Sequence, residues 1–166
     1  MPTKMLFYRV TDEDSVAAYE KGQGFIAGDT SFPITLNPVI QDDAIELKGH
    51  IQQHLKWKNR KPTPFISTYL NYHAAKTEAL RRTRDGKKRV VLWTISLDDD
   101  DDLEWATVYE LKRELGFWIP DNAFHNAKYE ALFVHEIPRD YVVGGEEYSY
   151  RRGRAAVIKW FPIHHS

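Results

Sequence analysis

The sequence predicts an α+β fold whose sheet is largely antiparallel or mixed. Six or seven short runs have the apolar and aromatic character of strands, and three or four segments have helical patterning. The two kinds of segment do not alternate regularly, as they would around a parallel sheet. No repeat of the solenoid type is present. At 166 residues, 42% of them hydrophobic, the chain is long enough to form a single packed domain over 1–166.

The composition excludes several classes of protein. The chain has no cysteine, so disulfides, zinc ribbons, iron–sulfur ligation and thiol nucleophiles are ruled out. Its formal net charge of −1 provides no overall attraction to nucleic acid or to an anionic membrane. The first ten residues lack the apolar stretch of a signal peptide, and no run approaches the ~20 apolar residues of a membrane helix. We therefore expect a soluble protein that acts inside a cell and makes no membrane contact.

The N-terminal part is predicted to contain two strands and two helices. The run 5–10, MLFYRV, has the aromatic and β-branched residues of a buried strand. Residues that can cap a helix, an alanine-containing body and Gly22 as a stop predict a helix over 12–22. A short strand or turn is expected at 24–29, before a loop with two prolines. Apolar residues at helical spacing predict a second helix over 42–57.

The middle of the chain carries the clearest signals. The run 64–69 is typical of a short strand, and 71–84 of a helix with its alanines inward and its arginines at the end. The turn signal DGKK precedes 89–97, which is the longest run of β-forming residues. In the segment 103–116 the second half is predicted to be helical, with Gly116 as its stop.

The C-terminal part is predicted to consist of a loop and several strands. The segment 117–130 is rich in aromatic side chains and contains a proline, which indicates a loop. A strand is expected at 131–137, a turn and a further short strand in the residues that follow, and a terminal strand at 154–163.

Several familiar site patterns are incomplete. The glycine pairs match neither a dinucleotide fingerprint nor a phosphate loop. His50 and His54 are four residues apart, as metal-binding histidines can be, but Ile51 stands where a zinc protease has its general base. We interpret both histidines as surface residues of a helix. The acidic run 98–102 lacks the ligand spacing of a calcium loop. No metal site is predicted.

A dispersed set of polar residues remains at the ends of the predicted strands. Arg9 lies near the end of the first strand, Ser67 and Thr68 near the end of the strand at 64–69, and Glu130 just before the strand at 131–137. Each residue has a simple structural interpretation: Arg9 could form an ion pair, Ser67 or Thr68 could cap the next helix, and Glu130 could be a surface charge. Their order and position together indicate a site.

In that order these residues resemble the R-S-E group of the ADP-ribosyltransferase superfamily, to which ADP-ribosylating toxins belong. The stretch YEALFVHEIPRDYVVG (129–144) is similar to the family's catalytic Glu with the strand and turn that follow it. FYRV (7–10) resembles the first-strand Arg motif, and PFISTYLNYHAAKTEAL (64–80) the Ser-Thr-Ser strand with its helix. The resemblance covers residues 6 to about 145. It implies two small, mostly antiparallel sheets that form an NAD-binding cleft flanked by helices.

The resemblance also implies roles for individual residues. Glu130 would be catalytic, because a carboxylate stabilises the positive charge that develops on the ribose as the bond to nicotinamide breaks. Arg9 would hold the pyrophosphate or adenosine-ribose side of NAD, since its planar fork binds phosphate in a bidentate way. Ser67 with Thr68 would orient Glu130 and the ribose. We therefore expect the tips of Arg9, Ser67 and Glu130 to converge in one cleft.

Aromatic residues complete the expected site. Tyr69 or Tyr72 would stack on nicotinamide, with packing in the core as the alternative. The segment before Glu130 corresponds to the family's acceptor-recognition loop. The side chains expected to contact an acceptor there are Trp118, Phe124 and His125.

Two departures from the family pattern bear on function. Tyr69 replaces the third residue of Ser-Thr-Ser, and Lys128 stands where arginine-modifying members have an acidic residue. A cation at that position would repel a guanidinium acceptor and could not deprotonate it. We therefore expect mono-ADP-ribosyl transfer from NAD to a macromolecule, foremost a protein, with NAD hydrolysis as a side or main activity.

Two alternatives stay open at this point. The first is a non-catalytic module that keeps the fold, which the same two departures would explain. The second is a transferase that modifies nucleic acid, which the arginines at 81, 82, 84 and 151–154 favour and the near-zero net charge opposes.

Overall fold

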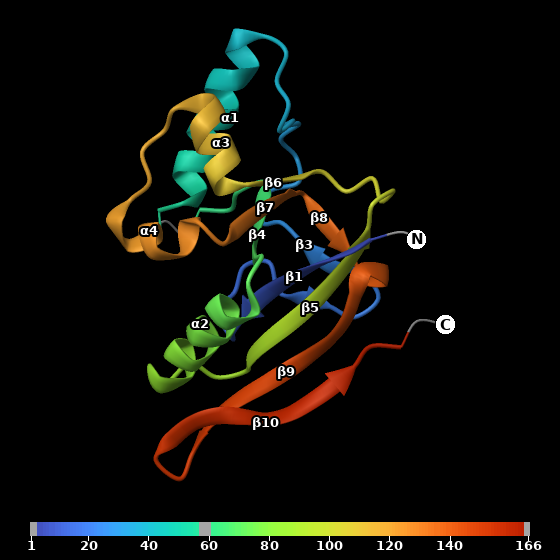
Figure 1. Ribbon diagram of the computed structural model, residues 1–166, viewed down its shortest axis with the longest axis vertical. Coiled ribbons are helices and arrows are strands. Elements are labelled where there is room, and N and C mark those ends of the chain that lie inside the picture. The colour runs from blue at the N-terminus through green and yellow to red at the C-terminus, as the bar shows by residue number, and fades with distance from the viewer. Residues whose placement is uncertain (1–2, 57–60, 165–166) are drawn as a thin grey trace.

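The computed structural model describes residues 3–56 and 61–164. Its main feature is a seven-stranded sheet with the order β10-β9-β5-β1-β4-β7-β6, and a separate three-stranded sheet has the order β2-β3-β8 (Figure 1). Every strand pairing among the described residues is antiparallel. The α+β prediction, with two antiparallel sheets, is therefore confirmed. The large sheet contains β1 (Lys4–Thr11), β4 (Phe65–Tyr69), β5 (Val90–Asp98), β6 (Trp105–Thr107), β7 (Glu130–Val134), β9 (Val142–Arg151) and β10 (Arg154–Pro162), and the small sheet contains β2 (Tyr19–Glu20), β3 (Gly24–Ile26) and β8 (Glu136–Pro138).

The helices form two separate groups along the large sheet (Figure 1). One group, α1, α3 and α4, shares a hydrophobic cluster with β4 and β7 that includes Leu47, Leu111 and Leu132. The second group is α2 alone, whose Ala75 and Ala79 are buried in a cluster with residues of β1, β5 and β9. Tyr69 of β4 packs against this cluster and Phe65 of the same strand belongs to the first, so both groups lie on one face of the large sheet. The helices are α1 (Gln41–His54), α2 (Tyr72–Arg84), α3 (Val108–Leu115), α4 (Asp121–Ala127) and the short 3-10 helix η1 (Arg139–Tyr141).

The two predicted helices with the best end signals begin and end as their sequences indicate. Asn71 caps α2 because its side chain accepts a hydrogen bond from the backbone N–H of Ala74. Thr107 caps α3 in the same way, through Glu110. Gly116 ends α3 in the left-handed conformation, with φ 70°, which a residue without a Cβ adopts at little cost.

A shared core joins the two sheets. Phe7 of β1 contacts Phe133 of β7 edge to face, with ring centroids 5.0 Å apart. From the small sheet, Phe25 contacts Trp93 of β5 in the same geometry, at 5.8 Å. Aromatic pairs of this kind add about 0.5–1.5 kcal/mol each to the energy of burial. The small sheet therefore packs against a face of the large one.

The segment 12–22 is not the helix that its sequence predicts. It forms turns and the short strand β2. Asp12 and Ser15 satisfy the turn locally, since the Asp12 N–H donates to the Ser15 hydroxyl and the Asp14 N–H to the Asp12 carboxylate. Tyr19 then stacks on Trp93, with ring centroids 4.4 Å apart. Burial of this aromatic ring against the sheet outweighs the weak helical propensity of the segment.

The segment predicted as a loop, 117–130, contains α4. Ala123 and Ala127 are buried against the cluster formed with α1 and α3, so tertiary packing stabilises a helix too short to form alone. The predicted strand 131–137 is divided at His135, whose φ of 65° turns the chain. Its first part is β7 of the large sheet and its second part is β8 of the small sheet. His135 thereby links the two sheets.

Candidate active site

The site is built around a hydrogen bond between Ser67 and Glu130. In the β4–β7 pairing Tyr69 lies opposite Glu130 and Ser67 lies opposite Leu132, so Ser67 and Glu130 are diagonal neighbours on one face of the sheet. The Ser67 hydroxyl donates to Oε2 of Glu130 at 2.7 Å. Thr68 points to the opposite face, where it is fully buried and its hydroxyl donates to the carbonyl of Ala131. The neighbouring hydroxyl residues therefore face different sides of the sheet.

Arg9 connects three segments beneath the same site. Its Nη1 donates to the carbonyl of Ser67 at 2.7 Å, and its Nε and Nη2 donate to the carbonyl of Ala17 at 3.3 and 2.8 Å. The guanidinium also lies over the ring of Phe25, 5.4 Å from the centroid. Among the described residues no carboxylate forms an ion pair with it. Burial, with the nearby charge of Arg82, lowers the pKa of Arg9 to about 9.

His54, at the end of α1, extends the contact between Ser67 and Glu130 into a chain. Its Nε2 lies 2.6 Å from the Ser67 hydroxyl oxygen, and its Nδ1 lies 2.5 Å from the hydroxyl oxygen of Thr63. Because the single hydroxyl hydrogen of Ser67 is directed at Glu130, Nε2 must be the donor and Nδ1 the acceptor. Hydrogen bonds then run in one direction, from Thr63 through His54 and Ser67 to the carboxylate.

The sequence interpretation of His54 as a surface histidine was wrong. His54 is seven residues after Leu47 and three after Ile51, both of which are fully buried. That spacing places the imidazole on the inward face of α1. The signal was present in the pattern of α1, but no sequence argument linked that face to Ser67. His50, one turn earlier, instead packs on the ring of Phe32, with centroids 4.3 Å apart.

The environment shifts the pKa values of both titratable groups in the chain of hydrogen bonds. Burial raises the pKa of Glu130 to about 7, although the hydrogen bond from Ser67 acts in the opposite direction. Burial and the charge of Arg9 lower the pKa of His54 to about 4. The imidazole is therefore neutral at neutral pH, as its donor and acceptor contacts require. Shifts in opposite directions within one cluster are typical of functional sites.

A cavity of about 480 Å³ opens over these groups. Its lining includes Arg9, His54, Ser67, Tyr69 and Glu130. The convergence expected for Arg9, Ser67 and Glu130 is therefore present, and the volume lies within the usual range for small-molecule sites, roughly 300–1,000 Å³. Asn126 of α4 also lines the cavity.

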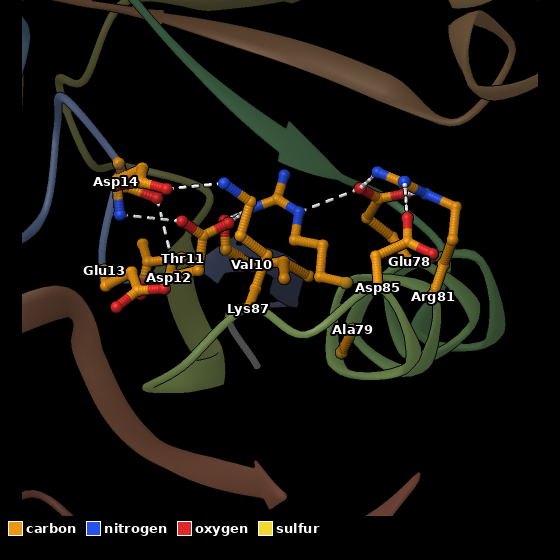
Figure 2. Close-up of polar contacts among 12 residues, drawn as sticks. Val10, Thr11, Asp12, Glu13, Asp14, Glu78, Ala79, Arg81, Asp85 and Lys87 are labelled. Carbon is orange, nitrogen blue, oxygen red and sulfur yellow. Dashed lines mark hydrogen bonds and ion pairs between the residues drawn. The ribbon is translucent and has the colours of Figure 1, made fainter. Parts of the chain in front are cut away.

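The loop that follows β1 also lines the cavity, and ion pairs connect it to α2 and to the turn after α2 (Figure 2). Lys87 forms an ion pair with Asp14, and Arg82 forms one with Asp12 at 3.1 Å. Glu78, which is 6% exposed, accepts hydrogen bonds from both Arg81 and Arg82. Figure 2 shows Asp14 beside Lys87 and Arg81 beside Glu78. These contacts fix the distance between the loop and the helix.

The aromatic residues named from sequence divide between the cavity and other places. Tyr69 lines the cavity. Tyr72 is not among the lining residues: its hydroxyl donates to Glu146, its ring meets Tyr8 edge to face, and burial with the nearby Glu146 raises its pKa to about 12. Trp118 and Phe124 are 67% and 54% exposed and do not line the cavity. The side chain of His125 lies outside the described residues.

Lys128 does not face the cavity as the sequence comparison suggested. It follows α4 and is exposed, with its ammonium 4.8 Å from the centroid of the Tyr129 ring. Because the segment is helical, the side chain that faces the cavity from this side is that of Asn126. On this side the cavity is therefore lined by a neutral amide and not by the ammonium group of Lys128.

The described residues lack the features of a metal centre and of a membrane-spanning helix. They contain no group of three or more histidine, aspartate or glutamate side chains placed to hold a metal ion. No helix in residues 3–56 and 61–164 has the length and apolar character needed to cross a membrane.

Known proteins resemble this chain mainly in structure. A solved structure named EcPltA matches with a TM-score of 0.58 at 14% sequence identity, over 98% of this chain and 87% of that one. The match shows an ADP-ribosyltransferase-like fold. No curated protein matches the sequence significantly. A family model described as "Domain of unknown function (DUF7587)" matches residues 2–149. Because this match covers most of the 166 residues, the chain belongs to the DUF7587 family.

Proposed function

We propose that the chain cleaves the nicotinamide–ribose bond of NAD and transfers ADP-ribose to a macromolecular acceptor. One observation carries the proposal: a carboxyl group, Glu130, is held by Ser67 at 2.7 Å in a cavity that Arg9 also lines. The ADP-ribosyltransferase-like fold agrees with this chemistry, but fold alone does not establish activity.

The reaction requires a carboxylate beside the sugar. When the C1′–N bond breaks, its electron pair leaves with nicotinamide and positive charge develops on the ribose, as in glycoside hydrolysis. Ionised Glu130 would stabilise this charge more strongly in the transition state than in the ground state. A nucleophile of the acceptor then bonds to C1′ and releases its proton. With water as the acceptor, the same residues would hydrolyse NAD.

Arg9 is suited to the phosphates of NAD. Its contacts with Ser67 and Ala17 leave one N–H free on each of Nη1 and Nη2. A buried cation without a carboxylate partner gains strongly from an anion, because the anion restores the charge balance that burial removed. Arg9 would therefore hold the pyrophosphate while its other donors keep β1 and β4 in register.

The acceptor side of the site favours a neutral group. Asn126 offers an amide that can donate and accept hydrogen bonds, but it cannot deprotonate a guanidinium. An arginine acceptor therefore remains disfavoured, now because of Asn126 and not because of Lys128.

Nicotinamide release from NAD tests the proposal. Wild-type protein and Glu130→Ala should be compared above pH 7, where Glu130 is mainly ionised. We expect Glu130→Ala to release nicotinamide on the order of 100 to 1,000 times more slowly. Glu136→Ala is the matched control, because Glu136 is exposed and lies on β8; its rate should equal the wild-type rate.

The opposite outcome would identify a non-catalytic module. Equal, background-level release from wild-type protein and Glu130→Ala would reject the transferase. If release occurs, labelled NAD offered with cell lysate identifies the acceptor class, since protease or nuclease treatment removes the label from the corresponding macromolecule.

A further inference from the structure

Charge is separated along the large sheet. The acidic run 98–102 follows the C-terminal end of β5, and Lys4 pairs with Asp98 there. The opposite end of β5 begins at Val90, which pairs with Tyr148 of β9. Figure 1 shows that the turn before β5, the C-terminal end of α2 and the β9–β10 hairpin turn gather at this second end. The net charge of −1 therefore conceals two ends of opposite sign.

Six cations at this second end, the basic end, have no acidic partner. All six are exposed, and none forms an ion pair among the described residues. Their neighbours differ, since Arg81, Arg82 and Lys87 pair with carboxylates. The arginines at 81 and 82, which the sequence linked with nucleic acid, are thus occupied internally. The basic end consists of Arg84, Lys88, Arg89, Arg151, Arg152 and Arg154.

We propose that the basic end binds single-stranded nucleic acid. Five of its six cations are arginines, whose planar forks bind phosphate oxygens in a bidentate way. Tyr150 is 55% exposed and pairs across the hairpin with the small residue Ala155. It lies on the same face of β9 as Tyr148, which packs with α2, whereas the next pair, Arg151 with Arg154, lies on the other face. The ring of Tyr150 is therefore on the side of the hairpin that faces α2, the helix that ends at Arg84. An exposed aromatic ring within a basic surface is the usual platform for stacking unpaired bases.

The acidic end does not cancel this attraction. The nine residues of β5 span roughly 30 Å, whereas the Debye length at physiological salt is about 8 Å. A polyanion at the basic end therefore experiences the local charge and not the net charge of the protein. The sequence argument against nucleic acid, which used net charge, overlooked this separation.

A membrane surface fits the observations less well. Stable attachment to anionic lipid requires apolar side chains beside the cations. The most exposed large apolar residue of β10 is Trp160, at 65%. It pairs with Glu146, far along the hairpin from the Arg151–Arg154 pair. Six residues of strand, roughly 20 Å, separate Trp160 from Arg154, so this ring does not lie beside the cations.

Fluorescence anisotropy with labelled single-stranded DNA and RNA oligonucleotides, without NAD, tests the proposal independently of the proposed enzymatic function. The wild-type protein should bind both, and the logarithm of its affinity should fall linearly with the logarithm of salt concentration. The double variant Arg151→Glu with Arg152→Glu should reduce that slope by about 1.4, since each lost phosphate contact removes about 0.7 for single strands. Tyr150→Ala should weaken binding roughly 5- to 150-fold at every salt concentration, the loss of one stacked base.

The matched control reverses the charge of two exposed side chains that lie outside the basic end. Lys112→Glu with Arg113→Glu, on α3, changes the net charge by the same amount, and its oligonucleotide affinity should equal the wild-type value. Circular dichroism verifies that each variant is folded. The proposal is overturned if wild-type protein does not bind oligonucleotides, if both double variants lose affinity equally, or if anionic vesicles are bound and oligonucleotides are not.

Discussion

The carboxyl group of Glu130 experiences two opposing influences. Burial disfavours its charge, and the Ser67 hydroxyl favours it, with a net increase of the pKa to about 7. An acid in this range changes its protonation state near neutral pH, so small changes around Ser67 alter the fraction that is ionised. Above its pKa the ionised, buried carboxylate therefore costs stability, a cost that active sites frequently carry.

The first prediction concerns stability and pH. The folded-state pKa of about 7 lies above the ordinary value of 4.5, so the folded state binds this proton more tightly and loses stability as pH rises between those values. Glu130→Gln has no carboxyl group at this position, so it should not lose stability in this way as pH rises. At pH 8 we expect the variant to be more stable by about 1–2 kcal/mol, allowing for solvent at the cavity mouth, and at pH 4 the two proteins should be equal. Urea unfolding at both pH values measures this.

The control for this prediction is Glu136→Gln, which makes the same substitution at an exposed position on β8, outside the cavity. The lowered pKa of His54 has the opposite effect on stability, which rises as pH increases between about 4 and 6.5, but it is common to all these proteins and cancels in the comparison. Equal pH profiles for Glu130→Gln and wild-type protein would contradict the raised pKa.

His54 is predicted to be a positioning residue. His54→Ala removes the donor to Ser67, so Ser67 becomes a weaker donor to Glu130. We expect kcat for nicotinamide release to fall roughly 10-fold with little change in KM, and the midpoint of the pH–rate profile to move to higher pH. His50→Ala, one turn earlier on α1, should leave kcat and the midpoint of the pH–rate profile unchanged. A fall in rate without the pH displacement would indicate a purely structural role.

At the scale of elements, the small sheet supports the site from below. Phe25 of β3 lies under the Arg9 guanidinium, and β3 is held by β8. The close contact of these strands depends on Gly24, where a Cβ would lie 2.2 Å from the carbonyl oxygen of Ile137. The position of Arg9 therefore depends on a glycine distant from it in the sequence.

A pair of glycines tests this contact. Gly24 and Gly22 both have φ of 93°, but a Cβ at Gly22 would meet nothing within 4 Å. Gly22→Ala should cost only the backbone strain, about 1–2 kcal/mol. Gly24→Ala should cost clearly more, because β3 and β8 must separate, and should also reduce NAD turnover. Thermal and urea unfolding measure the stability of the two variants. Equal losses of stability in Gly22→Ala and Gly24→Ala would show that β3 and β8 accommodate the added methyl group easily.

On the scale of the whole molecule, the cavity brings together segments from most of the chain. Its lining comes from β1, the end of α1, β4, α2 and the start of β7. A ligand that bridges these elements must stabilise the fold, since it binds only the folded state.

We therefore expect NAD to raise the melting temperature. At a concentration about 100-fold above its Kd, NAD should add ~2.7 kcal/mol, which corresponds to roughly 5–10 °C for a chain of this length. Differential scanning fluorimetry measures the change, with adenine alone as a control that should produce a smaller increase. The absence of an increase at any NAD concentration would contradict binding in this cavity.

Local signals predicted most of the regular structure. The stop of α3 at Gly116 and the β-forming runs of β1, β5 and β10 depend on neighbouring residues and were recognisable. The cap of α2 was not, because Asn71, and neither Ser67 nor Thr68, accepts the hydrogen bond at its start. The helix predicted at 12–22 and the loop predicted at 117–130 were wrong, because Tyr19 and Ala123 take their positions from partners far along the chain. The division of β7 from β8 at His135 had no sequence signal, since only the second sheet determines it.

The sequence by itself determined the fold class, the resemblance to ADP-ribosyltransferases and the order of Arg9, Ser67 and Glu130, because these follow from residue types and their spacing. Only the tertiary structure decided that Ser67 contacts Glu130 and Thr68 does not, that His54 belongs to the site, that Asn126 replaces Lys128 at the cavity, and that six cations gather at one end. These features depend on which strands pair and which face each side chain takes. Strand pairing and side-chain orientation are determined by the free energy of the whole folded chain, so they cannot be read from any one local segment.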